Sequence, residues 1–156
     1  MRYLGARPRT QREVERRLAR AGVEPPTIAG TVERLARLGY LDDAAFVRWW
    51  VEQRDRRAPR GRRMLEAELR QRGVGRDVLE ALRDELASPE RGADDDTLPG
   101  SDEERAQTAL AAHLRGRPLP TEPKALQRLG TFLMRRGFDP ETVRSVLRAA
   151  SDVDPD

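Results

Sequence analysis

The sequence predicts an all-α protein made of tandem three-helix repeats that form an elongated, curved molecule. The first observation behind this prediction is a pattern in which two apolar residues, one helical turn apart, precede a glycine and a further apolar residue. It occurs three times, as Val14, Leu18, Gly22 and Val23, as Leu65, Leu69, Gly73 and Val74, and as Leu129, Leu133, Gly137 and Phe138. Such units bury their apolar faces against their neighbours, so a stack is expected.

The other two observations are the amino-acid composition and the signals for the starts and ends of helices. Aromatic residues make up 4% and hydrophobic residues 37% of the 156 residues, so the core must consist of Leu, Val and Ala, which suit helices. Helix start signals precede the apolar segments, and glycines that can adopt a left-handed conformation follow them.

The first repeat is expected over residues 1–41. Thr10 and Glu13 form a capping box, so one helix starts near Gln11 and ends at Gly22. A second helix starts at Pro25 or Pro26 and ends before Gly39. A leading helix would need roughly a dozen residues ahead of Thr10. We therefore expect Tyr3 and Leu4 to be the remnant of a truncated helix, or the reading frame to start too late.

The second repeat is expected over residues 42–87 and the third over residues 101–150. Asp42 or Asp43 caps the leading helix of the second repeat, and Ser101 with Glu104 forms a capping box in the third. Counted from Asp42 to Asp102, the two repeats are 60 residues apart. Residues 88–100 read as an acidic flexible linker, and residues 151–156 as a disordered tail.

Catalytic and cofactor-binding patterns are missing from the sequence. It has no cysteine and one histidine, His113, which we place on a helix surface, and the serines have no candidate base nearby. It has no glycine-rich phosphate loop and no dinucleotide fingerprint. The run Asp94 to Asp96 is interpreted as linker and not as a cation site. We predict a protein that is not an enzyme and has no cofactor or metal.

Membrane and secretion signals are also missing. No apolar run reaches the length of a membrane helix, and residues 1–5 lack the hydrophobic region of a signal peptide. Together with the lack of cysteine, this predicts a soluble, cytoplasmic protein.

Charge is distributed unevenly along the chain. Residues 1–76 hold 19 arginines and 10 acidic residues, whereas residues 77–156 hold 11 basic and 17 acidic residues. The densest basic segment consists of Arg54, Arg56, Arg57, Arg60, Arg62 and Arg63. It can bind phosphates or an acidic protein surface, and a solvated arginine-rich face is an equally good interpretation. Of the adjacent Trp49 and Trp50, at least one is expected to pack in the core.

Several motifs resemble those of one family. They are Gly39, Tyr40, Leu41, Asp42 and Asp43 followed by Phe46, together with Glu13 and Leu18 ahead of Gly22, and Gly61, Leu65 and Leu69 ahead of Gly73. Over residues 10–150 the chain resembles the RecX family of bacterial recombination regulators. Apart from the resemblance, Tyr40 and Leu41 are expected to fix the angle between repeats by packing, and Asp42 and Asp43 to cap helices.

The resemblance implies a monomeric regulator that binds the RecA recombinase and lies in the groove of its filament on single-stranded DNA. There it would modulate, and mostly inhibit, the RecA ATPase, recombination and the SOS response. We assign the contact with RecA or DNA to the six arginines from Arg54 to Arg63. Direct DNA binding is left open, as are two alternatives: a stand-alone nucleic-acid-binding repeat protein, and a helical adaptor for another partner.

Overall fold

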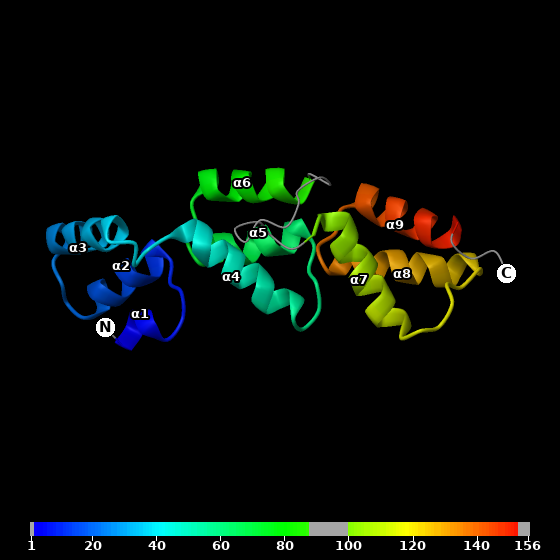
Figure 1. Ribbon diagram of the computed structural model, residues 1–156, viewed down its shortest axis with the longest axis horizontal. Helices are drawn as coiled ribbons and strands as arrows, with labels where there is room; N and C mark the ends of the chain where they lie inside the picture. The colour runs from blue at the N-terminus through cyan, green and yellow to red at the C-terminus, as the bar shows by residue number, and fades with distance from the viewer. Residues whose placement is uncertain (1, 88–99, 153–156) are drawn as a thin grey trace.

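The protein is a row of short helices, shown in Figure 1 as a computed structural model that describes residues 2–87 and 100–152. The described residues form nine helices and no strand, which confirms the predicted all-α class. The helices are α1 (Arg2–Gly5), α2 (Gln11–Arg20), α3 (Pro25–Arg37), α4 (Asp43–Asp55), α5 (Arg62–Gln71), α6 (Arg76–Ala87), α7 (Asp102–Leu114), α8 (Pro123–Arg135) and α9 (Pro140–Asp152).

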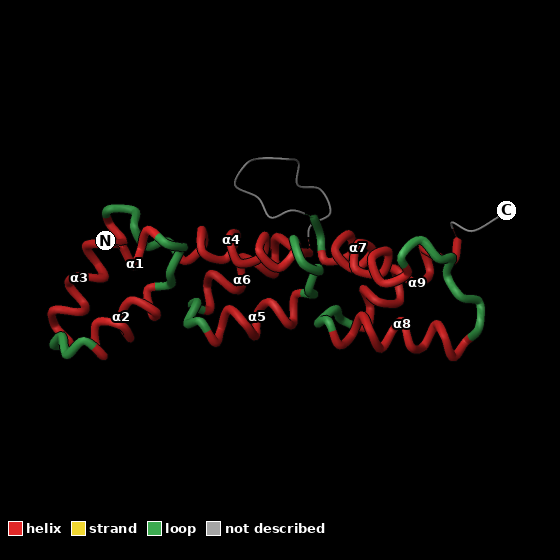
Figure 2. Tube along the Cα trace, turned by 90° about the horizontal axis from the view of Figure 1, so that it is seen from below, coloured by secondary structure: helices red, strands yellow, loops and turns green. Residues whose placement is uncertain are grey.

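Successive groups of three helices lie side by side along the molecule: α1 to α3, α4 to α6 and α7 to α9 (Figure 1). The middle helices α2, α5 and α8 follow one another along one edge (Figure 2). The last helices α3, α6 and α9 form a second row, and α4 and α7 run obliquely to both rows (Figure 1). The molecule is therefore a tandem repeat with one distinct row of helices for each position in the repeat.

Each repeat has its own hydrophobic core. Phe46, Leu65 and Leu82 belong to the core of the second repeat, and Leu133 and Phe138 to that of the third, and all five are 0 to 2% exposed. In the described part of the first repeat only three hydrophobic residues are buried, and they are Val14, Val32 and Leu41. The first core is small because α1 is a single turn, so Tyr3 and Leu4 only partly cover it.

The helix ends follow the predicted signals. Thr10 and Glu13 form the capping box of α2, and Ser101 and Glu104 form that of α7. Gly22, Gly39, Gly73 and Gly137 all have positive φ, between 77° and 94°. These predictions were confirmed because caps depend on residues close together in sequence.

The structure differs from the prediction at the end of the last helix and in the correspondence between the repeats. Ser151 and Asp152, assigned to a disordered tail, form the last turn of α9. The repeats correspond through Asp43 and Asp102, because both are the first helical residue after the N-cap, so the predicted match of Asp42 with Asp102 was wrong by one residue. Residues 88–99 of the predicted linker, including Asp94 to Asp96, lie outside the described residues.

The helices are short, with at most 13 residues each. At 1.5 Å per residue such a helix spans about 20 Å, less than the roughly 30 Å hydrocarbon core of a bilayer. Accordingly, none of the helices in the described part of the chain is long and apolar enough to cross a membrane.

Candidate interaction surface

The repeats are joined end to end through hydrogen bonds to backbone carbonyls. At the junction of the second and third repeats, the N–H of Gly61 donates to the carbonyl of Arg136 at 2.8 Å, and the N–H of Arg63 donates to that of Gly137 at 3.1 Å. At the first junction, the Thr10 hydroxyl donates to the carbonyl of Arg72 at 2.7 Å. The start of α5 therefore meets the end of α8, and the start of α2 meets the end of α5. This places α2, α5 and α8 head to tail.

Glycine allows the helix ends to approach this closely. A Cβ atom on Gly137 would lie 2.5 Å from Cβ of Met64, and one on Gly73 would lie 2.4 Å from Cβ of Arg12. Gly22 occupies the same place in the first repeat, and no atom of the described residues lies within 4 Å of a Cβ built there. Gly73 and Gly137 are thus required by space as well as by φ, whereas Gly22 is required by φ alone.

An aspartate closes each junction. Oδ1 of Asp43 accepts a hydrogen bond from the N–H of Gln11 at 3.1 Å, and Oδ1 of Asp102 accepts one from the N–H of Arg62 at 2.9 Å. Burial raises the pKa of Asp43, and it raises the pKa of Asp102 to about 6. Oδ2 of Asp102 is buried and has no hydrogen-bond partner among the described residues. The environment of Asp102 therefore makes its ionised form less favourable than that of an exposed aspartate.

We expect the contribution of Asp102 to the stability of the protein to fall as the pH rises from about 4 to about 6. A carboxyl whose pKa is raised on folding contributes stability that is present below its unfolded pKa and is lost as the pH rises through its folded pKa. For Asp102 the loss is about 2 to 3 kcal/mol. Asp102→Asn keeps the acceptor for Arg62 and should flatten this slope in urea unfolding followed by circular dichroism. An unchanged slope in the variant would assign the pH dependence to other groups.

The six arginines proposed for partner contact separate into two sets. Arg54 and Arg60 pair with Glu68, and Arg62 pairs with Glu66 and lies 3.8 Å from Asp139. These three side chains are between 26% and 32% exposed. The remaining three are exposed and have no carboxylate partner among the described residues: Arg56, Arg57 and Arg63. Only the second set is free to contact a partner.

Arg105 is a structural residue of the junction that sequence reasoning missed. It is 3% exposed, and its guanidinium donates to Asp55 at 2.7 Å and to the carbonyl of Arg60 at 2.9 Å. Arg105 follows Asp102 by three residues, just as Phe46 follows Asp43 in the second repeat. The third repeat therefore has a charged side chain at the position where the second repeat has an aromatic core residue. Aligning Asp102 with Asp43 in the sequence would have revealed that Arg105 replaces an aromatic core residue.

The basic residues are concentrated on one row of helices. Helices α2, α5 and α8 hold ten basic and four acidic residues within their bounds. The helices α3, α4, α6, α7 and α9 hold nine basic and thirteen acidic residues. Charge is therefore separated across the molecule as well as along the chain, and the edge formed by α2, α5 and α8 in Figure 2 is its basic side.

The residues of the motif around Asp42 have different roles. Leu41 is 4% exposed and packs in the first core, and Phe46 is fully buried in the second. Tyr40 is 52% exposed, so the prediction that it packs between repeats was wrong. Asp42 accepts from the N–H of Ala45 and caps α4. The positive φ of Gly39 allows α3 to end before this motif.

The tryptophans lie side by side on α4. Trp50 is 7% exposed, and its indole N–H donates to Glu68 at 2.8 Å. Trp49 is only partly buried and packs against the same core. The prediction that at least one tryptophan is a core residue is confirmed.

Comparison with known proteins identifies the family. Family models described as the first, second and third three-helix domains of RecX match residues 1–35, 42–82 and 101–147. This chain belongs to the RecX family. The regulatory protein RecX of Mycobacterium sp. (strain JLS) is 34% identical over 142 residues, which cover 88% of this chain and 72% of that protein. The one from Prosthecochloris aestuarii is 34% identical over 147 residues, which cover 93% of this chain and 86% of that protein.

The fold also agrees with a solved RecX structure. The crystal structure of RecX from Lactobacillus salivarius superposes with a TM-score of 0.77 over 97% of this chain and 92% of that one, at 15% sequence identity. A second RecX crystal structure gives a TM-score of 0.66 at 18% identity and covers 92% of this chain and 66% of that one. RecX is thus a family of regulatory proteins with the same row of three-helix units.

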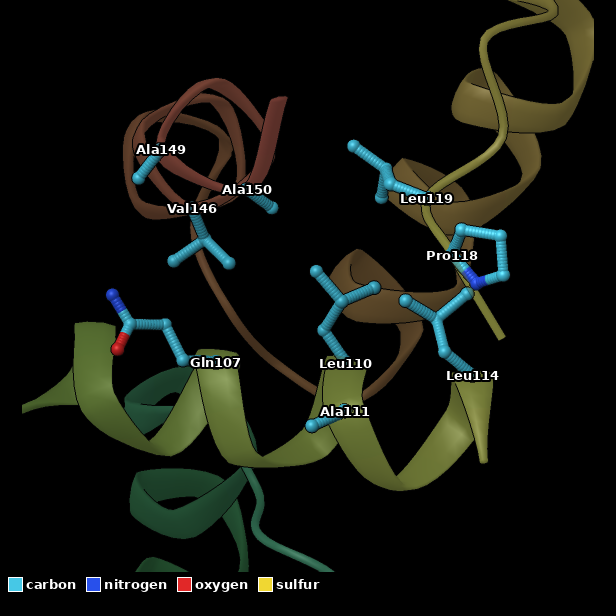
Figure 3. A pocket seen from close by; sticks show the side chains of 9 residues that line it. All are labelled: Gln107, Leu110, Ala111, Leu114, Pro118, Leu119, Val146, Ala149 and Ala150. Atoms are coloured by element: carbon cyan, nitrogen blue, oxygen red, sulfur yellow. The ribbon is translucent and has the colours of Figure 1, made fainter. Parts of the chain in front are cut away.

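In this RecX family member, the third repeat carries an apolar groove of about 510 Å³ between α7, α9 and the loop at Pro118 and Leu119 (Figure 3). Ala150 lines it, at the position that Leu86 fills in the second repeat. Gln107 is the only polar residue among those lining it. The groove offers contact area for an apolar side chain and no group for acid–base chemistry.

Proposed function

We propose that the protein binds RecA and its filament on single-stranded DNA, and that it modulates, mostly by inhibition, the RecA ATPase, recombination and the SOS response. Membership of the RecX family supports a regulatory role. The observation that supports the mode of binding is the basic row of α2, α5 and α8. A row of cationic helix faces can follow an elongated polyanionic assembly over several contacts at once, and linked weak contacts give a strong overall interaction.

The exposed arginines at the start of α5 and in the segment between α4 and α5 are the best candidates for contact. Arg56, Arg57 and Arg63 extend from the junction of the second and third repeats, where Arg54, Arg60 and Arg62 are held by carboxylates. Of the held arginines, Arg62 reaches across the junction to Asp139. The exposed ones present guanidinium groups to acidic side chains or phosphates. The protein acts as a monomer in the cytoplasm in this proposal.

Arg57→Ala with Arg63→Ala should weaken inhibition of the RecA ATPase on single-stranded DNA about tenfold, measured as the protein concentration that gives half-inhibition. Both side chains are exposed, so helicity and unfolding midpoint should stay unchanged. The matched control is Arg34→Ala with Arg37→Ala on α3, which removes two exposed arginines from another row. Equal inhibition by the two double variants would move the contact away from this junction.

The alternative is a stand-alone nucleic-acid-binding protein that uses the same basic row without RecA. Titration of labelled single-stranded DNA in the absence of RecA, together with the ATPase assay, distinguishes the two. Tight DNA binding with no effect on ATP hydrolysis by RecA would favour the alternative.

A further inference from the structure

A second basic site, which the sequence patterns did not indicate, lies at the other junction. The N-terminal cleft is a hollow of about 680 Å³ where α1 and α2 meet the end of α5. Six arginines, one aromatic residue and one acidic residue line it: Arg7, Arg9, Arg16, Arg17, Arg20 and Arg72, with Tyr3 and Glu13. A concave surface with this excess of positive charge attracts a polyanion.

The single acidic residue of the cleft is already neutralised. Glu13 accepts hydrogen bonds from Arg7 at 3.1 Å, from Arg72 at 3.2 Å and from the backbone N–H of Thr10 at 3.2 Å. Burial acts to raise the pKa of Glu13, but these hydrogen bonds outweigh it and the pKa is lowered. The four remaining arginines contact no carboxylate among the described residues: Arg9, Arg16, Arg17 and Arg20.

Two of these four form a stack with the aromatic ring. The guanidinium of Arg9 lies 4.1 Å from the centroid of the Tyr3 ring, and that of Arg17 lies 4.2 Å from it. The Arg9 side chain also donates to the carbonyl of Tyr3 at 3.4 Å, which holds α1 against the cleft. Planar guanidinium groups held in this way offer flat surfaces on which an unpaired base can stack.

The other two lie one helical turn apart on α2. Arg16 and Arg20 are both exposed and line the same cleft. Their spacing of about 5 to 6 Å suits a ligand with regularly repeated charges. An acidic peptide would satisfy these charges but would leave the stacked groups without a planar partner, so the combination favours nucleic acid.

We propose that the N-terminal cleft binds single-stranded nucleic acid, with phosphates on Arg16 and Arg20 and an unpaired base against the stack of Arg9, Tyr3 and Arg17. This deepens the proposed function, since it assigns the DNA strand of the nucleoprotein partner to the first repeat. The contact with RecA remains with the arginines around Arg57 and Arg63.

The test is binding of the full chain to a fluorescein-labelled oligothymidylate of about 16 nucleotides, without RecA, followed by fluorescence anisotropy over a series of salt concentrations. Arg16→Ala with Arg20→Ala should weaken binding about tenfold. The slope of log affinity against log salt should become shallower by about 1.4, because two fewer phosphates of a single strand would be neutralised.

Two double variants with the same spacing and the same loss of charge serve as controls. Arg144→Ala with Arg148→Ala on α9 lies outside the basic row, and Lys124→Ala with Arg128→Ala on α8 lies within it at the opposite end. Both should keep wild-type affinity and salt slope. If the α9 variant lost as much affinity for the oligomer, the effect would come from net charge alone. If the α8 variant lost as much affinity, the whole row of helices would bind the oligomer. Either result overturns the proposal.

The stacking contact has its own test. Arg17→Lys keeps the charge but removes the planar guanidinium, so it should weaken binding severalfold while leaving the salt slope unchanged. An abasic oligomer should bind wild type and this variant equally. Wild-type affinity in the variant, or equal affinity for a duplex or an oligoglutamate peptide, would overturn the assignment to single-stranded nucleic acid.

The RecA ATPase assay separates the two proposals. If the wild-type chain binds the oligomer as described but has no effect on ATP hydrolysis by RecA, the proposed function fails and the cleft assignment stands. If it inhibits RecA but does not bind the oligomer, the cleft assignment fails and the proposed function stands.

Discussion

Arg105→Ala is expected to lower the free energy of unfolding by about 3 to 5 kcal/mol, because it removes one partner of a buried ion pair. Arg105 is 3% exposed and holds both Asp55 and the carbonyl of Arg60. Its loss leaves the partly buried Asp55 carboxylate with no opposite charge and the carbonyl without a donor. Urea unfolding followed by circular dichroism measures the effect directly.

The loss should depend on pH. Burial already raises the pKa of Asp55, and the charge of Arg105 opposes that rise. Without Arg105 the pKa rises further, so the variant gains stability in acid relative to neutral pH. The deficit against wild type should therefore be smaller at low pH and should grow as the pH increases through the raised pKa.

The control for this prediction is the double variant Arg105→Met with Asp55→Leu. Replacing both members of a buried ion pair by apolar residues of similar volume is often neutral or stabilising. The double variant should recover most of the stability that Arg105→Ala loses. If both variants were equally unstable, the loss would come from altered packing of α7 and not from an uncompensated carboxylate.

Gly137→Ala is expected to cost about 4 kcal/mol of stability. One part is the strain of a side chain at a φ of 94°, which costs on the order of 1 to 2 kcal/mol. The other part is overpacking, which adds about 1 to 3 kcal/mol, because the new Cβ would lie 2.6 Å from the backbone N of Met64 and 2.5 Å from its Cβ. Backbone atoms at this distance move only if α5 and α8 separate.

Gly22→Ala is the matched control, since both glycines follow the end of the middle helix of a repeat and both have positive φ. Apart from its chain neighbours, no atom of the described residues lies within 4 Å of a Cβ at Gly22, so only the strain of about 1 to 2 kcal/mol remains. Thermal unfolding should show a large shift for Gly137→Ala and a small one for Gly22→Ala. Similar shifts would mean that the junction relaxes and that close packing there is not required.

Local signals accounted for most of the fold. Capping boxes, prolines at helix starts and glycines past helix ends act between residues three or four positions apart, so the sequence alone predicted the ends of α2 and α3 and the start of α7. The register between repeats was wrong by one residue. Two adjacent aspartates could each cap α4, and the linker of uncertain length concealed which of them matches Asp102.

The interaction surface was predictable only in part, because its pairs join distant positions in the chain. Arg60 was expected to contact a partner and instead pairs with Glu68. Asp43 was expected to cap a helix, and it binds the first N–H of the helix in the preceding repeat. The stack of Arg9 and Arg17 on Tyr3 forms only once α1 folds back on α2. No spacing rule relates such residues before the repeats are placed side by side.

The end-to-end order of α8, α5 and α2 gives the molecule a direction. Peptide dipoles in the three helices point the same way, and at each junction the positive end of one helix faces the negative end of the next. These inner ends compensate one another, whereas the start of α8 and the end of α2 beside Gly22 face no further helix of the row. The two ends of the row of helices α2, α5 and α8 therefore differ electrostatically. A nucleic-acid strand also has two distinct ends, 5′ and 3′, so it accommodates this row in one orientation better than in the reverse.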